Sequence, residues 1–316
     1  MEQNFTYDMF LSDVKSNQKQ ILDEGIVKIK GAKIYNYISD DLSINASARP
    51  TASDQYTIAI NKGLLLAIFN YSNDVIRPFY KSYSSRLNLT EELFVRFVCG
   101  VMADFIFWHE LSHIVRGHFQ YLGISQSEKP LSFNLSKLGK HRVAELDADI
   151  YGASFLFLRV LCVINSGSVR PEDALCCYTV GLRAIFEILH NDNKLEDLTH
   201  HENEHPHSQA RAFNAYSFGV ASPEVINYKQ DKMPYYQECV EQYFLDFEIL
   251  ALGNRFNIDA VSDIMPIDVS QWLSEKENVD FLSHMSYENR TFYERLKSNL
   301  RYVKNWLRCI KNQQKV

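Results

Sequence analysis

The feature that most constrains the fold of this chain is a long apolar segment that contains two histidines. Thr90, followed by Glu91 and Glu92, is typical of a helix start. Apolar residues then recur at helical spacing as far as Val115, so the sequence predicts one long buried helix over about 90–118. Imidazoles inside such a helix cost free energy unless they have partners, and a bound metal ion would satisfy both.

The two histidines lie in the sequence His109-Glu110-Leu111-Ser112-His113. Residues four apart on a helix share one face, so the two imidazoles can bind a single Zn²⁺ together. Glu110 then lies beside the metal, where a carboxylate can act as a general base. The alternative is a pair of core histidines that are hydrogen-bonded within the protein. The spacing favours a zinc hydrolase.

A catalytic zinc takes three protein ligands and leaves a fourth position for water, so a third ligand is expected elsewhere. The best candidate is Glu145, in a second apolar helical segment predicted over about 141–165. Asp149 lies four residues later on the same face and can accept the outer N–H of a ligand histidine. Asp147 points away from that face, and we expect it to be solvated. For any one of these carboxylates, the alternative is an acidic helix start stabilised by the macrodipole.

The H-E-x-x-H motif at 109–113, followed by E-x-x-A-D at 145–149, resembles the gluzincin metallopeptidases. The closest resemblance is to the CAAX-prenyl-protease and HtpX-like group, metallopeptidase family forty-eight. Ser112 stands where that family usually has glycine. His118 stands where the family often has a further histidine. At 100° per residue it lies about 140° from His113, which turns it away from the metal, so we assign it to the helix end.

Two further elements resemble the same family. Upstream, Asn45-Ala46-Ser47-Ala48 is similar to its Asn-Ala-x-Ala strand, and a return strand and a Gly-Leu-Leu helix start follow at 56–60 and 63–65. Downstream, His205-Pro206 with Arg211 resembles its His-Pro-x-x-x-x-Arg element. Together the matching elements span about residues 44–218.

The resemblance implies a zincin-like (minigluzincin) core with a small antiparallel sheet, in a soluble form of the family. It implies one Zn²⁺ per chain, held by His109, His113 and Glu145, and hydrolysis of peptide bonds with Glu110 as the general base.

The resemblance also implies roles for the two outer elements. His205 and Arg211 are expected to donate hydrogen bonds to the tetrahedral intermediate, although His205 could instead occupy the water position and switch the enzyme off. A protein or peptide substrate is expected to pair as an added strand with Asn45, Ala46, Ser47 and Ala48.

The expected fold class is α+β and mostly helical, in three parts. Residues 1–43 contain a helix and a strand at 26–30, residues 44–220 form the metallopeptidase domain, and residues 221–316 form a helical C-terminal extension. The domain begins with a hairpin around 50–55. Further helices are expected near 62–80, 172–190, 207–218, 235–250 and 287–310.

Composition limits the compartment and the partners. The net charge is −6 and no basic cluster occurs, which argues against a nucleic-acid surface. No window of about 20 uncharged apolar residues occurs, so we expect no membrane span. The first residues do not resemble a secretory signal. The six cysteines have no paired spacing, which is typical of reduced core residues in a cytoplasmic protein. The oligomeric state stays open.

Two other functions are compatible with the sequence. One is a metal-dependent regulatory or phage-exclusion peptidase that acts on one cytoplasmic partner protein, in the manner of the Lit-like peptidases. Regulators of this kind often carry a helix-turn-helix, and none is evident. The other is a catalytically silent zinc-site scaffold that works by binding, which a zinc-free preparation would favour.

Overall fold

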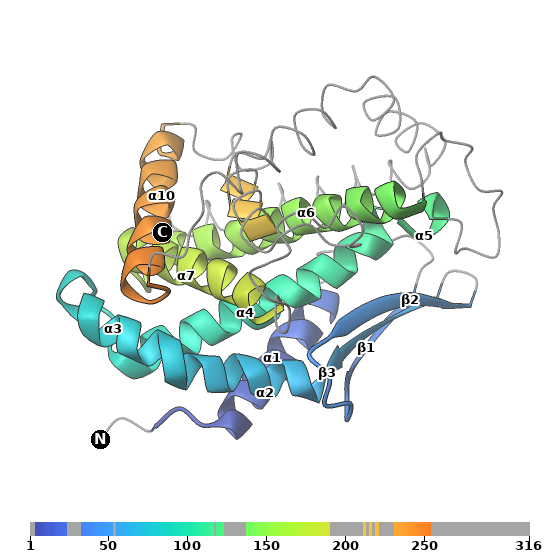
Figure 1. Ribbon diagram of the computed structural model, residues 1–316, viewed down its shortest axis with the longest axis horizontal. Coiled ribbons are helices and arrows are strands. Elements are labelled where there is room, and N and C mark those ends of the chain that lie inside the picture. Colours follow the sequence, from blue (N-terminus) through green and yellow to red (C-terminus); the bar gives the residue numbers. More distant parts are fainter. Residues whose placement is uncertain are drawn as a thin grey trace, which may run out of the picture.

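The fold is built around the helix α4 (Glu91–Val115). It is seen in a computed structural model that describes residues 4–23, 33–52, 55–116, 118–122, 137–189, 211–212, 215–216, 219–220 and 231–253. The Thr90 hydroxyl accepts a hydrogen bond from the N–H of Leu93, which caps the first turn. Every residue from Val101 to Val115 is buried, because other elements surround this helix (Figure 1). The predicted histidine helix is confirmed, but it ends at Val115.

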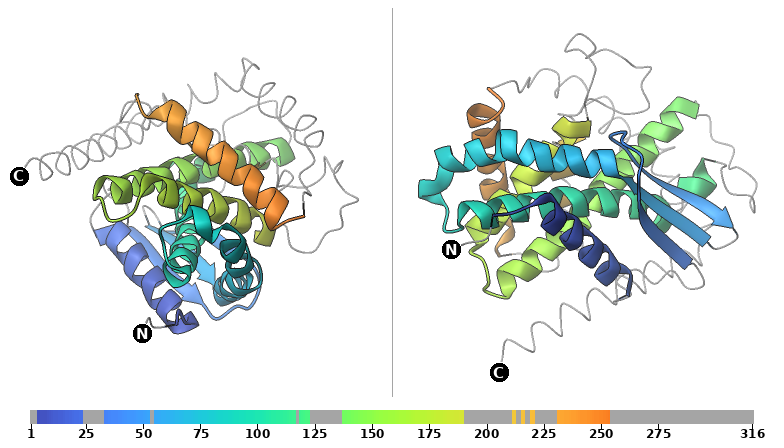
Figure 2. Two further views of the ribbon diagram at one scale, coloured as in Figure 1. Left: turned by 90° about the vertical axis from the view of Figure 1, so that its left-hand side faces the viewer. Right: turned by 90° about the horizontal axis from the view of Figure 1, so that it is seen from below.

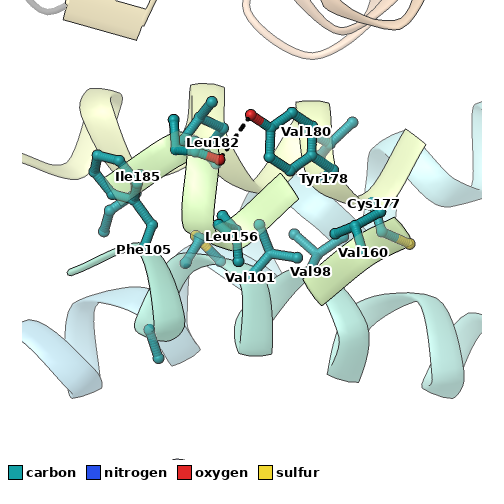
Figure 3. Packing of buried hydrophobic residues seen from close by; sticks show 14 of the residues in the cluster. Val98, Val101, Phe105, Leu156, Val160, Cys177, Tyr178, Val180, Leu182 and Ile185 are labelled. Carbon is teal, nitrogen blue, oxygen red and sulfur yellow. Dashed lines mark hydrogen bonds between the residues drawn. The ribbon is translucent and has the colours of Figure 1, made fainter. Parts of the chain in front are cut away.

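Two helices, α6 (Lys137–Asn165) and α7 (Pro171–Leu189), pack on α4. α6 runs antiparallel to α4, since Asp104 in the middle of α4 pairs with Arg159 late in α6, and Arg116 after the end of α4 pairs with Asp147 in the first half of α6. Both helices begin close to their predicted starts. Figure 3 shows the seam between the three helices, which is filled by Val98, Val101, Phe105, Leu156, Val160, Cys177, Tyr178, Leu182 and Ile185.

A three-stranded sheet lies at one end of these helices and contacts α4 (Figure 1). The strands β2 (Ala46–Ala52) and β3 (Gln55–Asn61) form the antiparallel hairpin that the sequence predicts. The strand β1 (Lys33–Ser39) is parallel to β3 on its other side, so the sheet is mixed and not antiparallel as expected. A parallel pair depends on a long connection, which no local pattern in the sequence reveals.

The remaining helices enclose α4 and α7. The helix α1 (Tyr7–Asp23) packs on α4, and α10 (Met233–Leu250) packs on α7, on opposite sides of the helical layer in Figure 2. Where one helix is predicted over 62–80, three helical pieces follow β3 without a break. They are α2 (Lys62–Tyr71), the π-helical turn η1 (Ser72–Ile76) and α3 (Arg77–Tyr83), and the short η2 (Ser84–Arg86) comes next.

Segments from different predicted parts share one core. α1 and β1, from the predicted N-terminal part, contact α4 and β3, and α10 contacts α7. The strand predicted at 26–30 and the helix predicted at 287–310 lie outside the described residues. Of the helix predicted at 207–218, the residues 211, 212, 215 and 216 are described, and they are helical.

Two expectations from composition can be compared with the described residues. The five cysteines among them, Cys99, Cys162, Cys176, Cys177 and Cys239, are free thiols that are buried or half-buried. None of the described helices combines the length and the apolar character that crossing a membrane requires.

Candidate metal centre

Two pairs of side chains face each other across the interface of α4 and α6. His109 and His113 come from α4, and Glu145 and Asp149 come from α6. The His109 Nε2 and His113 Nε2 atoms are 3.2 Å apart. The Glu145 carboxylate oxygens lie 3.3 Å from His109 Nε2 and 3.6 Å from His113 Nε2. Bonds of about 2.0–2.1 Å around a tetrahedral zinc ion place ligand atoms about 3.3 Å apart. The two nitrogens have this spacing, and each has a different oxygen of Glu145 at a similar distance, Oε2 beside His109 and Oε1 beside His113.

His109, His113 and Glu145 are the one group of three metal-ligating side chains found among the described residues. Their donor atoms all lie within 4.8 Å of one another. Two histidine nitrogens and a carboxylate oxygen are a donor set that suits zinc and leaves a coordination position open. This group can hold a metal ion.

Gly152 sets the distance between the two helices at the site. A Cβ atom at Gly152 would lie 3.1 Å from the His109 backbone nitrogen and 3.2 Å from its Cα, closer than an ordinary contact. The absence of a side chain thus lets the backbone of α6 approach α4 one turn away from Asp149. Ser112, which replaces the usual glycine of the motif, is fully buried, and its hydroxyl donates to the Trp108 carbonyl at 2.7 Å.

Asp149 lies behind His109. Its Oδ1 is 2.9 Å from His109 Nδ1, on the side of the ring that faces away from the other two donors. Arg211 donates to the same carboxylate from Nε at 2.7 Å and from Nη2 at 2.9 Å. The Asp149 side chain is fully buried. His109 is thus oriented by a carboxylate that is itself fixed by a bidentate arginine.

Arg211 is buried, and its Nε and Nη2 groups are engaged with Asp149. Its guanidinium also lies over the Phe186 ring and 3.8 Å from Glu145. Through these contacts, Arg211 fixes Asp149 and lies beside Glu145, one of the three candidate ligands. The oxyanion role expected for Arg211 stays a prediction, and His205, its expected partner, lies outside the described residues.

The side chains around the site carry an excess of negative charge, which a bound cation could balance. Glu110, Glu145 and Asp149 bring three carboxylates, and Arg211 brings one guanidinium, so two negative charges remain when the histidines are neutral. Without a metal, burial works to lower the pKa of His109, but Asp149 and Glu145 outweigh it and raise that pKa to about 10. Burial lowers the pKa of His113 to about 3. A proton on His109 thus supplies part of the positive charge that a metal ion would supply.

Glu110 is buried on α4, which contacts β2 of the sheet. Burial raises the pKa of its carboxyl group to about 7. The backbone of Ala48, in β2, lies near enough to this carboxyl group to offset part of the increase in its pKa. β2 is an edge strand in the described sheet, and Asn45, Ala46, Ser47 and Ala48 therefore lie along the edge that borders Glu110.

His118 and Asp147 make contacts that the sequence did not predict, although His118 lies outside the donor group, as expected. Because α4 ends at Val115, His118 opens a separate short helix, α5 (His118–Tyr121), and a continuous helical angle no longer applies. Its Nδ1 is 2.9 Å from the Nδ1 of His113. Asp147 is 6% exposed, and the expectation that it is solvated is wrong. It pairs with Arg116 and hydrogen bonds to His118. Helical angles alone could not reveal this, because the partners come from beyond the helix end.

Comparison with protein-family models, curated proteins and solved structures found no match. The resemblance to the gluzincins therefore rests on the motifs and on the geometry of the site.

Proposed function

We propose that this chain is a zinc-dependent endopeptidase of the gluzincin type. The observation that carries the proposal is the set of three metal-ligating side chains, His109, His113 and Glu145, whose donor atoms lie within 4.8 Å of one another beside a buried Glu110. Two core histidines without a metal would explain neither the third donor nor the excess of negative charge around them. A zinc ion at this site would supply an activated water molecule and polarise the carbonyl of the scissile bond.

Glu110 is the residue that would take a proton from the attacking water. It lies next to His109 in the sequence, it is buried, and it does not belong to the donor set, so its carboxylate is available to accept a proton. The protonated carboxyl group can then pass the proton to the leaving amine. A general base contributes about 100-fold to 10,000-fold to the rate.

Asp149 and Arg211 would act on the same reaction through His109. His109 Nδ1 lies 2.9 Å from Asp149 Oδ1, so a hydrogen on Nδ1 would face this carboxylate and leave Nε2 unprotonated for a metal. Arg211 keeps Asp149 ionised, since it holds the pKa of that carboxyl group below its ordinary value although burial works to raise it. His109 is thereby held in the tautomer that the site requires.

The substrate class that fits is an extended peptide segment. β2 has a free edge in the described sheet, and Ala48 on that strand contacts Glu110. An added strand would bind through main-chain hydrogen bonds along β2. This arrangement would bring its carbonyl groups past the Glu110 carboxylate.

The test uses the zinc-loaded protein and a mixture of peptides made from unfolded proteins, with cleavage sites identified by mass spectrometry. Glu110→Gln is the matched control, because it keeps the shape of the side chain and all three donors. The wild type is expected to cleave, and Glu110→Gln to cleave about 100-fold to 10,000-fold more slowly with the same zinc content. Equal cleavage by both proteins would refute the mechanism.

A further inference from the structure

A series of hydrogen bonds leads from His113 away from the donor set. His113 Nδ1 contacts His118 Nδ1 at 2.9 Å, and His118 Nε2 contacts Asp147 Oδ2 at 2.9 Å. Asp147 accepts from the Arg116 Nε at 2.8 Å and from its Nη2 at 3.1 Å. His118 is 1% exposed and Asp147 is 6% exposed, so water does not compete freely with these contacts.

The direction of each hydrogen bond follows from the first one. If His113 binds a metal through Nε2, its Nδ1 carries the hydrogen and donates. The Nδ1 of His118 must then accept, so its hydrogen lies on Nε2 and is donated to Asp147. Both rings are neutral in this arrangement, and every donor has an acceptor. One tautomer of His118 therefore matches one metal-binding tautomer of His113.

We propose that His118, with Asp147 and Arg116 behind it, is a positioning residue that holds His113 in its metal-binding orientation and tautomer. This inference rests on the metal site of the proposed function. It makes the two halves of the site alike: a carboxylate from α6, clamped by a bidentate arginine, supports each ligand histidine. Asp149 does so for His109 directly, and Asp147 does so for His113 through His118.

The short helix α5 is held from two sides, which gives His118 a fixed position. Phe119 stacks on Tyr56 of β3, with ring centroids 6.1 Å apart. On the other side, the Arg116 guanidinium lies 3.9 Å above the centroid of the Tyr151 ring of α6. The segment that carries His118 is thus fastened to the sheet and to α6 at once. A preformed second ligand shell of this kind raises metal affinity because the ligand needs no ordering when the ion binds.

A purely structural role of the Arg116–Asp147 pair predicts a different effect of its variants on zinc affinity. The Arg116–Asp147 pair joins α4 to α6, and so does the pair of Asp104 with Arg159 at 2.9 Å, further along the same two helices. If the first pair only fastened the helices together, disrupting either one would lower stability and leave zinc affinity unchanged. Asp104→Asn is therefore the matched control for Asp147→Asn.

The experiment measures zinc affinity by competition with a chelator, beside the unfolding midpoint of each protein. His118→Gln keeps an amide near the Nε2 position and loses the acceptor for His113, whereas His118→Asn keeps an acceptor near the Nδ1 position. We expect His118→Gln and Asp147→Asn to lose about 10-fold to 100-fold in affinity. His118→Asn should retain affinity within about threefold, and Asp104→Asn should match the wild type.

Two outcomes would overturn the proposal in distinguishable ways. A wild type that binds no zinc would remove both this inference and the proposed function. Wild-type zinc binding with an equal affinity in His118→Gln would remove this inference alone.

Nitrogen-15 NMR of the zinc-loaded wild type gives a test that needs no variant to fold. We expect the Nε2–H tautomer for His118, and a hydrogen on its Nδ1 would contradict the proposed direction of the hydrogen bonds.

Discussion

The replacement of Arg211 by methionine tests how the ligand shell is held together. The fully buried Asp149 carboxylate has two hydrogen bonds from Arg211 and one contact with His109. Methionine keeps much of the volume and removes the charge. Removal of one partner of a buried ion pair costs about 3–5 kcal/mol. Because a protonated His109 still faces Asp149 in the metal-free protein, we take the lower value, about 3 kcal/mol. Unfolding entropy is about 2.1 cal/mol/K per residue, so in a chain of 316 residues each kcal/mol shifts Tm by about 1.5 °C.

The assay is thermal unfolding of the metal-free protein, followed by a zinc titration. Arg211→Met should unfold about 5 °C lower and bind zinc about 10-fold to 100-fold more weakly, because His109 loses its orientation. Arg211→Lys keeps the charge without the bidentate contact. Its Tm and its zinc affinity should lie between those of the wild type and those of Arg211→Met. The double variant Arg211→Met with Asp149→Leu should recover part of the lost stability, since no buried charge is left unpaired.

An oxyanion role for Arg211 predicts a different result. If the guanidinium served only the tetrahedral intermediate, its removal would lower kcat by about 100-fold to 1,000-fold. Tm and zinc affinity would then stay at their wild-type values. That combination would refute the positioning account of Arg211.

Three further predictions concern the close packing and the ionisation of the site. Gly152→Ala should weaken zinc binding about tenfold, because its methyl group would meet the His109 backbone at 3.1–3.2 Å and displace α6. Gly100→Ala, whose methyl group would meet nothing within 4 Å, is the control, and equal affinities in the two variants would contradict the prediction. Zinc must displace the proton from His109, whose pKa is about 10, so its affinity should rise about tenfold per pH unit between about pH 6 and 8. A calorimetric titration that shows no proton release would exclude this. Because burial raises the pKa of Glu110 from 4.5 to about 7, this residue lowers the stability of the metal-free fold progressively between these pH values, and the full loss is present above about pH 7. Glu110→Gln should therefore be more stable than the wild type at about pH 7 and above, by about 1–3 kcal/mol in urea unfolding.

The sequence predicts those features of the site that depend on helical spacing. The periodicity of residues 90–115 and the cap at Thr90 are local signals, and they place His109 and His113 on one face of a buried helix. The spacing of Glu145 and Asp149 is equally local, and the structure brings both side chains to the two histidines. The helical repeat therefore predicts which side chains share a face, and the site forms where the two faces meet.

Other features depend on contacts that no local pattern encodes. Because α4 ends before His118, the His118 side chain can contact His113. In the sequence, Gly117 is a helix-stop signal that indicates such an end. The burial of Asp147 depends on Arg116 and His118, which come from beyond that end. The parallel pairing of β1 depends on its position beside β3, across a connection that the sequence pattern leaves open.

The most direct test of the account is the metal content of the purified protein beside that of a Glu145→Ala variant, since it requires no substrate. The account predicts about one tightly bound zinc per chain in the wild type and much less in the variant. A wild type that binds no zinc after reconstitution, or a variant that holds as much zinc as the wild type, would contradict the site formed by His109, His113 and Glu145.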